Sequence, residues 1–256
     1  MKYYVVADVH GFYTEMRKAL DEKGFFCDDR PHKLIVCGDL FDRGSEALQM
    51  QDFILDLIKK DEVILIRGNH EDLIMNLIDD WEDFGYMQSH HRLNGTIDTV
   101  LQLTQSPDIM YINAREVKRK LVNTSYVKTI IPNTIDYFET EHYIFVHGWI
   151  PCAAYGYSGQ ESVFIYEKDW RSASAGEWSR ARWYNGMAAA RQGVTEPGKT
   201  IVCGHRCAVY GHARIEGVCS ENGADADFSP YFAKGIIAID AGTARFKKVN
   251  CIVLED

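Results

Sequence analysis

Asp39 and Asp42 stand three residues apart in the stretch LIVCGDLFDRG, and Arg43 follows directly. The apolar run at 34–37 predicts a strand that is buried on both faces and ends at Gly38. Polar groups just past such a strand lie where open α/β sheets bind their ligands. Isolated charges are costly there, so this cluster requires either a metal ion or a network of ion pairs.

Other polar residues also follow short apolar runs along the chain. With Asp39 they form a set of two carboxylates, three imidazoles and one amide: Asp8, His10, Asp39, Asn69, His147 and His205. First-row divalent ions accept mixed nitrogen and oxygen donors of this kind. One carboxylate can bridge two ions, and two ions about 3.5–4 Å apart form a clamp for in-line displacement at phosphorus. The alternative is a set of capped turns and surface polar groups, but five loops that carry one chemistry favour the metal site.

The same loops carry groups that could act on a phosphate. Arg43 and Arg67 could bind its non-bridging oxygens bidentately, although either could instead brace a turn or lie on the surface. His70 could protonate a leaving group, and Asp42 could hold the other nitrogen of that imidazole.

Three strand–loop–helix units in series must position these residues. The predicted strands are 3–7, 34–37 and 63–66, and apolar residues at helical spacing follow each of them. The second helix is predicted at 45–60, with Ser45 as its cap. Such repeated units indicate a parallel sheet with helices packed against it.

The remainder of the chain is less regular. Residues 83–134 are predicted to form a helical insertion, and 151–198 to form long loops and short helices rich in aromatic residues. Further strands are predicted at 143–146, 199–203 and 235–239, and an antiparallel strand at 246–254. Asp240 also ends a strand, and we interpret it as a structural turn former before Gly242.

Composition limits the class of protein. The 256 residues are expected to form a single domain, and a net charge of −9 disfavours non-specific binding to nucleic acid. We find no apolar stretch long enough to span a membrane and no secretory signal. The seven cysteines include no CxxC pair, which favours reduced thiols and a cytoplasmic location. We therefore expect a cytoplasmic monomer without nucleic-acid or membrane partners.

Five strings in order resemble the phosphoprotein phosphatase branch of the calcineurin-like metallophosphoesterases, especially its bacterial and phage serine/threonine phosphatases. They are DVHG at 8–11, GDLFDRG at 38–44, RGNHE at 67–71, VHG at 146–148 and GH at 204–205. The resemblance implies a mixed α+β or α/β fold of two packed β-sheets flanked by helices. The last histidine stands in GHRC, without a second histidine two residues later, which fits the phosphoprotein branch better than the nuclease and phosphodiesterase branches.

The resemblance implies a dinuclear metal site at the sheet edges. Asp8 and His10 would bind the first ion and Asp39 would bridge both, while the second ion would be held by Asn69, His147 and His205. Manganese is the expected metal, with iron, zinc, nickel or cobalt as alternatives.

The resemblance also implies a set of catalytic residues: His70, Asp42, Arg43, Arg67 and Arg180. In it, His70 is the acid and Asp42 is its partner. The substrate phosphate would be bound by Asn69 and the three arginines. Arg180 is preferred over Arg182 as the arginine that comes from the later loops.

The implied reaction is hydrolysis of a phosphomonoester by direct attack of a metal-bridging hydroxide, without a covalent enzyme intermediate. Phosphoserine or phosphothreonine in a protein is the first expectation for the substrate. A dinucleoside tetraphosphate is the alternative, and the aromatic loops at 149–184 could stack its base. A catalytically inactive metal-binding module is a third reading, which the intact motif set opposes.

Overall fold

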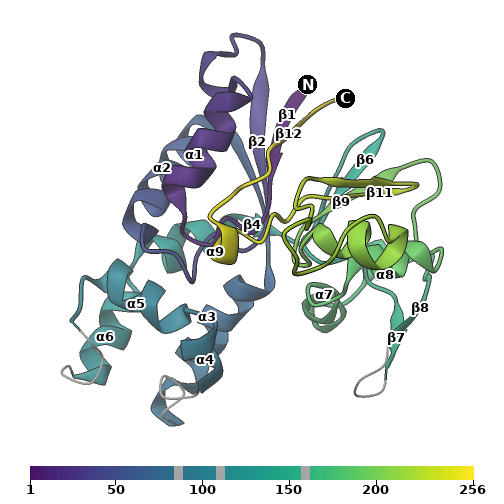
Figure 1. Ribbon diagram of the computed structural model, residues 1–256. Coiled ribbons are helices and arrows are strands. Elements are labelled where there is room, and N and C mark those ends of the chain that lie inside the picture. The colour runs from purple at the N-terminus through teal and green to yellow at the C-terminus, as the bar shows by residue number, and fades with distance from the viewer. Residues whose placement is uncertain (84–88, 108–112, 157–161) are drawn as a thin grey trace.

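The computed structural model is described for residues 1–83, 89–107, 113–156 and 162–256. Parts of the predicted insertion, 84–88 and 108–112, lie outside the described residues, as does 157–161 in the aromatic loops. Two five-stranded sheets with helices on their outer faces make up the architecture (Figure 1). This confirms the fold class that was expected from the motifs.

The first sheet has the strand order β12-β1-β2-β3-β4. Its strands are β1 (Lys2–Val6), β2 (His32–Cys37), β3 (Val63–Ile66), β4 (Thr134–Ile135) and β12 (Ile252–Glu255). Strands β1, β2 and β3 are parallel, as predicted, β4 was not predicted and pairs parallel with β3, and β12 pairs antiparallel with β1. The predicted strand at 246–254 is wrong in its first half, because α9 (Thr243–Phe246) ends there and Lys247 has a left-handed backbone, φ 49°.

The second sheet has the strand order β10-β11-β9-β6-β5. Its strands are β5 (Phe138–Glu139), β6 (Tyr143–Phe145), β9 (Thr200–Cys203), β10 (Tyr231–Ala233) and β11 (Ile236–Ala238). Strands β6, β9 and β11 are parallel to one another, whereas β5 and β10 pair antiparallel at the two edges. A separate hairpin pairs β7 (Ala153–Tyr155) with β8 (Val163–Ile165).

Helices cover the outer face of each sheet. Figure 1 shows α1 (Tyr13–Glu22) and α2 (Ala47–Lys60) beside the first sheet, and α7 (Ala175–Ala181) and α8 (Gly186–Arg191) beside the second. Helix α2 begins at Ala47 after Glu46, without a side-chain cap, so the predicted cap at Ser45 is wrong. Short 3₁₀ turns lie at Phe25–Cys27 and Trp170–Ser172, and a π-helical turn at Gly211–Glu216.

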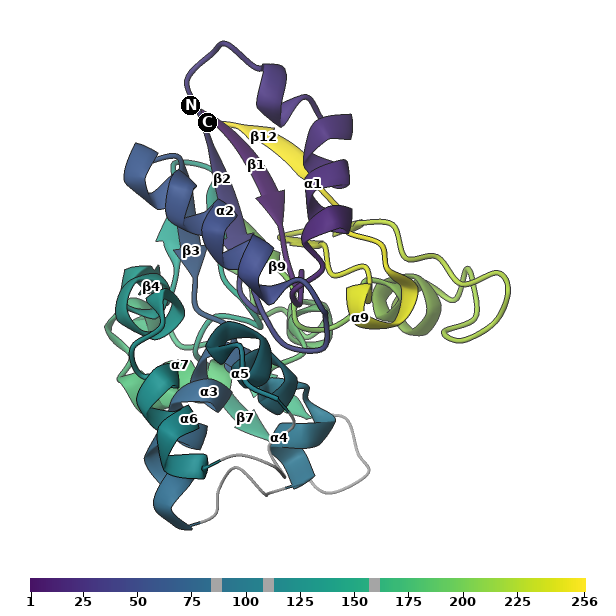
Figure 2. The ribbon, with the colours of Figure 1, turned by 90° about the vertical axis from the view of Figure 1, so that its left-hand side faces the viewer.

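The predicted insertion is helical where it is described. Helix α3 (Asn69–Asp79) leads into it through a 3₁₀ turn at Asp80–Asp83, and α4 (Ser89–Leu93), α5 (Thr96–Thr104) and α6 (Ala114–Leu121) follow. Two further turns, at Tyr126–Ile130 and Ile131–Asn133, lead into β4. Figure 2 shows these helices gathered at the end of the molecule toward which β1 points, which is where the polar loops lie. Within the described ranges, none of the helices combines the length and the apolar composition that a membrane crossing requires.

The core of the sandwich explains why its strands are apolar on both faces. Val5 and Ile35 on the inner face of the first sheet pack with Phe145 and Val202 of the second. The alternate residues, such as Val36, face the helices instead. Because both faces are buried, the strands can present polar residues only at their ends, and the carboxyl ends of the parallel strands therefore carry the site.

Candidate metal centre

The predicted metal ligands meet at the carboxyl ends of β1, β2, β3, β6 and β9. A cavity of about 190 Å³ there is lined by Asp8, His10, Asp39, Arg43, Asn69, His70, Trp183, His205, Asp240 and residues 242–245. His147 is buried beside it, with Nε2 3.4 Å from Oδ1 of Asp39. The structure thus brings all six predicted metal ligands together, although they come from loops spread over about two hundred residues.

The backbone is bent sharply at these residues. Six of them have a left-handed conformation that is uncommon outside glycine: Asp8, His10, Asp39, Asp42, Arg43 and His205. Each such residue costs about 1–3 kcal/mol, and clusters of them mark functional sites. Glycine is needed at Gly68 and Gly204, because a Cβ at either position would overlap a carboxylate oxygen, that of Asp39 or that of Asp8.

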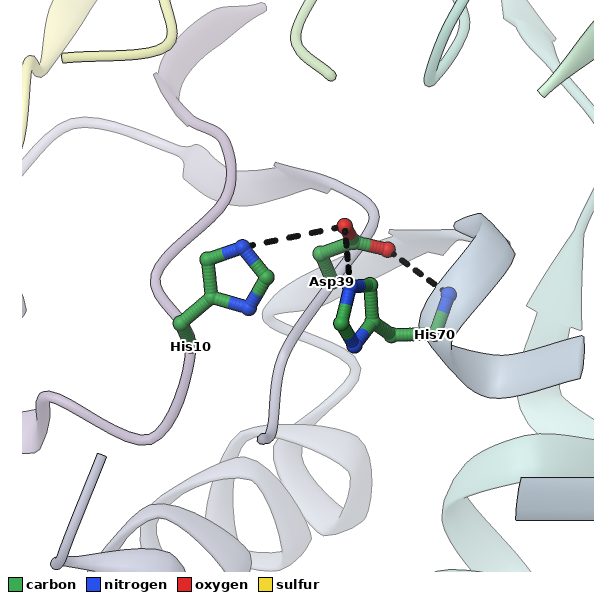
Figure 3. A group of neighbouring side chains, drawn as sticks. All are labelled: His10, Asp39 and His70. Carbon is green, nitrogen blue, oxygen red and sulfur yellow. Dashed lines mark hydrogen bonds and ion pairs between the residues drawn. The ribbon is translucent and has the colours of Figure 1, made fainter. Parts of the chain in front are cut away.

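Asp39 lies between two groups of potential ligand atoms. One group is His10, Asp39 and His70, and the other is Asp39, His147 and His205; within each group the ligand atoms lie within 4.8 Å of one another. Oδ2 of Asp39 is 3.8 Å from Nε2 of both His10 and His70 (Figure 3). A carboxylate with imidazoles on both sides has the position that a bridging ligand requires.

The hydrogen bonds of His147 show that its donor atoms fit a cation. Nδ1 of His147 lies 2.8 Å from the carbonyl oxygen of Cys37, which can only accept, so Nδ1 carries the proton. In the neutral ring Nε2 then presents a lone pair, and it lies 2.8 Å from Oδ1 of Asn69. Nδ1 of His205 lies 3.0 Å from the same oxygen. An imidazole lone pair facing an amide oxygen is unfavourable without a cation, and a divalent ion satisfies both atoms.

His10 has the same arrangement at the other end of the site. Its Nδ1 lies 3.0 Å from the carbonyl oxygen of Phe41, so Nε2 carries the lone pair that a metal ion would bind. Burial lowers the pKa of both His10 and His205 to about 3, so both rings are neutral at neutral pH. Neutral imidazoles are the form that binds metal ions.

Arg43 lies across the first group of ligand atoms. Its guanidinium donates hydrogen bonds from Nη1 to Nε2 of His10 at 3.0 Å and from Nη2 to Nε2 of His70 at 3.1 Å. Nη2 also lies 3.4 Å from Oδ1 of Asn94 in the insertion. Arg43 therefore has the location that was predicted for a phosphate-binding residue.

Three carboxyl groups, those of Asp8, Asp39 and Asp240, are buried together at the site. Burial raises the pKa of Asp8 well above its usual range, and the neighbouring Asp240 and Asp39 raise it further. Asp39 is the exception, because nearby imidazoles, His147 first, outweigh the effect of burial and hold its pKa below the ordinary value. An excess of buried carboxylates is expected where a cation binds.

Asp240 has a position in the site that the sequence interpretation did not include. It does form the expected turn, accepting a hydrogen bond from the backbone N–H of Gly242 at 2.7 Å. It also lines the metal cavity, and burial raises its pKa to about 6. The signal was present in the sequence, because Asp240 follows a buried strand as Asp8 and Asp39 do.

His70 is held by a hydrogen bond to Asp42. Nδ1 of His70 lies 2.7 Å from Oδ2 of Asp42, and Asp42 also accepts from Thr96 at 3.0 Å and from Thr99 at 2.7 Å. Burial lowers the pKa of His70, but Asp39 and the hydrogen bond to Asp42 outweigh it and the pKa is raised. Sequence reasoning missed the two threonines, which lie in the insertion and follow no motif.

Glu71 fixes the loop of β2 to that of β3. Its carboxylate accepts hydrogen bonds from the backbone N–H groups of Gly68 at 2.8 Å, Asp39 at 3.0 Å and Leu40 at 3.0 Å. The side chain is fully buried. Glu71 was quoted in the RGNHE string, but its function as a brace for the metal loops was not predicted.

The other predicted arginines lie elsewhere. Nε of Arg67 is 2.8 Å from Asp72, and the second oxygen of Asp72 is 2.6 Å from Nη1 of Arg182, which also pairs with Asp136. Arg180 is exposed and lines a different cavity with Glu177. Among the described residues that line the metal cavity, the arginines are Arg43 and the unpredicted Arg245. Phosphate binding by Arg67 and Arg180 stays a prediction.

Comparison with known proteins places the fold and the motifs in a family. The family model described as "calcineurin-like phosphoesterase" matches residues 1–228. The chain is also similar to a solved structure of a cold-active protein-tyrosine phosphatase from a psychrophilic Shewanella, with a TM-score of 0.55 and 17% identity over 100% of this chain and 75% of that one. At that identity the likeness shows the fold alone.

Two curated relatives match a shorter stretch. A symmetrical bis(5'-nucleosyl)-tetraphosphatase of Buchnera aphidicola subsp. Acyrthosiphon pisum (strain Tuc7) is 36% identical over 78 residues, which are 30% of this chain and 26% of that protein. An asymmetrical one, PrpE of Anoxybacillus flavithermus (strain DSM 21510 / WK1), is 32% identical over 78 residues, 28% and 32% of the two chains. The matched part thus spans about a quarter to a third of these relatives. Because the family model matches residues 1–228 of this chain, the chain belongs to the calcineurin-like phosphoesterase family.

Proposed function

We propose that this phosphoesterase uses bound divalent metal ions to hydrolyse dinucleoside tetraphosphates. The observation that carries the metal-dependent reaction is the position of Asp39 as a member of two groups of buried or partly buried ligand atoms, with Arg43 and His70 on the same cavity. The nucleotide substrate rests on the curated relatives, whose printed names are those of bis(5'-nucleosyl)-tetraphosphatases. It replaces the phosphoprotein as the first expectation for the substrate.

The donor set divides into two overlapping parts. Asp8, His10 and Asp39 would hold one ion, and Asp39 with the amide of Asn69 and the imidazoles of His147 and His205 would hold the other. Bound there, divalent ions supply Lewis acidity at phosphoryl oxygens and lower the pKa of water. Which metal is bound in the cell depends on availability as well as on the ligands, and manganese stays our expectation.

The protein's own groups orient the phosphate and supply a proton. Arg43 presents two N–H groups to the cavity and can bind two non-bridging oxygens at once. Once Arg43 donates to the phosphate in place of Nε2, His70 would hold a proton at Nε2 for the leaving oxygen, while Asp42 fixes the ring through Nδ1. The raised pKa of His70 supports this proton-donor function over metal binding, since a metal ligand must be unprotonated.

The test compares substrates on one preparation reconstituted with manganese. We expect kcat/KM for diadenosine tetraphosphate to exceed that for a phosphoserine peptide by about tenfold or more, with nucleotide products identified by chromatography. Asp39→Asn, prepared in parallel, controls for contaminating phosphatases. A higher kcat/KM for the phosphopeptide would instead support a protein serine/threonine phosphatase. Full metal occupancy without turnover of any ester would indicate the inactive binding module.

A further inference from the structure

Trp183 is a large aromatic residue that lies outside the hydrophobic core. Its side chain is 51% exposed, whereas Trp149, Trp170 and Trp178 in the core of the second half are 1–3% exposed. Its ring centroid lies 5.7 Å from that of His205, at an interplanar angle of 82°. Trp183 is therefore placed beside a predicted metal ligand, with much of its surface open to solvent.

Trp183 lines two cavities at once. One is the metal cavity, and the other has a volume of about 400 Å³. The volume of this second cavity is in the range of sites for small ligands, about 300–1,000 Å³. A ligand with its phosphate at the metal centre could therefore extend past Trp183 into the second cavity.

The second cavity combines aromatic and cationic groups. Its walls include Phe164, Tyr184 and Tyr210, and two arginines, Arg206 and Arg214. The Arg206 guanidinium lies 5.2 Å from the ring centroid of Tyr210, in a cation–π contact. Aromatic faces and guanidinium planes bind nucleobases by stacking, whatever the base.

The charges of the second cavity suit a phosphate chain. Nη2 of Arg206 lies 3.0 Å from Oε1 of Glu221, and Nε of Arg214 lies 2.7 Å from Oε2 of the same residue. One carboxylate between two guanidiniums leaves this group of three with a net positive charge. Arg206 directly follows His205 in the chain, so the positive charge lies next to the metal centre.

We propose that the second cavity is a nucleoside subsite, in which the base stacks on Trp183 and Arg206 attracts the adjoining phosphates. The inference rests on the proposed function, because it names the part of the chain that holds one nucleoside of that substrate. Stacking of one base on an aromatic side chain corresponds to about a 5- to 150-fold change in binding. Loss of the Trp183 ring is therefore measurable.

The test uses two inhibitors of p-nitrophenyl phosphate hydrolysis that differ only in the nucleoside. ADP and methyl diphosphate carry the same diphosphate group, so the ratio of their inhibition constants isolates the contribution of adenosine. For the wild-type holoenzyme we expect ADP to inhibit at least about tenfold more strongly than methyl diphosphate. Trp183→Ala should reduce this advantage to about threefold or less, and Trp183→Phe should retain most of it.

Phe232→Ala is the matched control, because Phe232 is a similarly exposed aromatic residue, on β10, and its removal should leave the ADP advantage unchanged. Calorimetric titration with the same two compounds gives a second readout that needs no turnover. Arg206→Gln should weaken both compounds by a similar factor, since it acts on the shared phosphates. Equal binding of ADP and methyl diphosphate by the wild type, or an ADP advantage that survives Trp183→Ala, would overturn the inference.

These outcomes are separable from the fate of the proposed function. If the wild type fails to hydrolyse diadenosine tetraphosphate but shows a Trp183-dependent ADP advantage, the subsite is supported and the proposed substrate is wrong. If it hydrolyses diadenosine tetraphosphate without any ADP advantage, the proposed substrate is supported and the subsite is wrong. If Trp183→Ala weakens hydrolysis of a phosphopeptide but does not change the ADP advantage, the cavity binds a peptide side chain and the inference is wrong.

Discussion

Nδ1 of His70 lies 2.7 Å from Oδ2 of Asp42, and both side chains are almost completely buried. The pair joins the start of α3 to the loop after β2, and the hydroxyl groups of Thr96 and Thr99 on α5 complete the shell around Asp42. The helical insertion thus reaches the centre of the site, where it orients the His70 ring through Asp42.

Asp42→Asn should change the pH dependence of the reaction. His70 must be protonated to act as an acid, so activity is lost as pH rises through its pKa. Asp42 raises that pKa, and removing its charge should lower it, which moves the alkaline limb of the kcat profile to lower pH. We also expect kcat for phenyl phosphate, a poor leaving-group substrate, to fall by about 10²–10⁴. An alkaline limb that stays in place would argue against His70 as the acid.

Asp39→Asn should remove both metal binding and activity. Asp39 belongs to both groups of ligand atoms, so its loss affects both ions. We expect elemental analysis to show a clear loss of bound manganese, and kcat/KM for p-nitrophenyl phosphate to fall by about 10³ or more, as for other cooperating sets. Asp52→Asn, on the exposed face of α2, is the control and should retain both metal and activity.

Glu71→Ala should lower the free energy of unfolding. Three buried backbone N–H groups lose their acceptor, and each unsatisfied group costs about 1–3 kcal/mol. We expect a loss of at least about 3 kcal/mol by urea denaturation, together with weaker metal binding. Glu22→Ala on α1 provides an exposed comparison. A loss below about 1 kcal/mol would mean that the loops do not depend on this brace.

Arg182 should contribute to the stability of the fold, whereas Arg180 should not. Arg182→Met removes the buried guanidinium that Asp72 and Asp136 share, while Asp72 keeps its ion pair with Arg67, and it should cost about 1–3 kcal/mol of stability, measured by urea denaturation. Arg180→Ala, at an exposed position, should cost less than about 0.5 kcal/mol. If Arg180→Ala nevertheless lowers kcat/KM more than about tenfold, the phosphate-binding function predicted from the sequence holds in spite of its location.

Asp240 should make the metal-free protein sensitive to pH. Burial raises its pKa from an ordinary 3.8 to about 6, so its contribution to stability is fully present below about pH 4 and is lost as pH rises through 6. Between pH 4 and pH 7.5 the unfolding free energy of the wild type should therefore fall by about 2–3 kcal/mol relative to that of Asp240→Asn. Denaturation of chelator-treated protein across this range measures it, and adding metal should reduce the difference. If the difference between the two proteins does not change with pH, the pKa of Asp240 is not raised by its burial in the site.

The sequence was most informative where buried strands end. Apolar runs with polar ends identified the loops of Asp8, Asp39 and Asn69, because parallel strands bring their carboxyl ends to one edge of the sheet. The same pattern identified His147 and His205 in the second sheet, and the motif strings indicated that they belong to one site with the residues of the first sheet.

Contacts between distant segments were beyond sequence reasoning. Thr96 and Thr99 belong to an insertion without a motif, and their function depends only on where α5 packs. The sequence could not decide between Arg180 and Arg182, because residues two apart on a helix point to nearly opposite sides. Which side faces the site is set by tertiary packing.

The centre draws its donors from both sheets, with Asp8, Asp39 and Asn69 on one side and His147 and His205 on the other. An ion bound there would link the two sheets. Its binding free energy would then also stabilise the packing of one sheet against the other. A substitution that weakens the packing between the sheets, such as one at Val202 in the core that they share, should therefore also weaken binding of the ion.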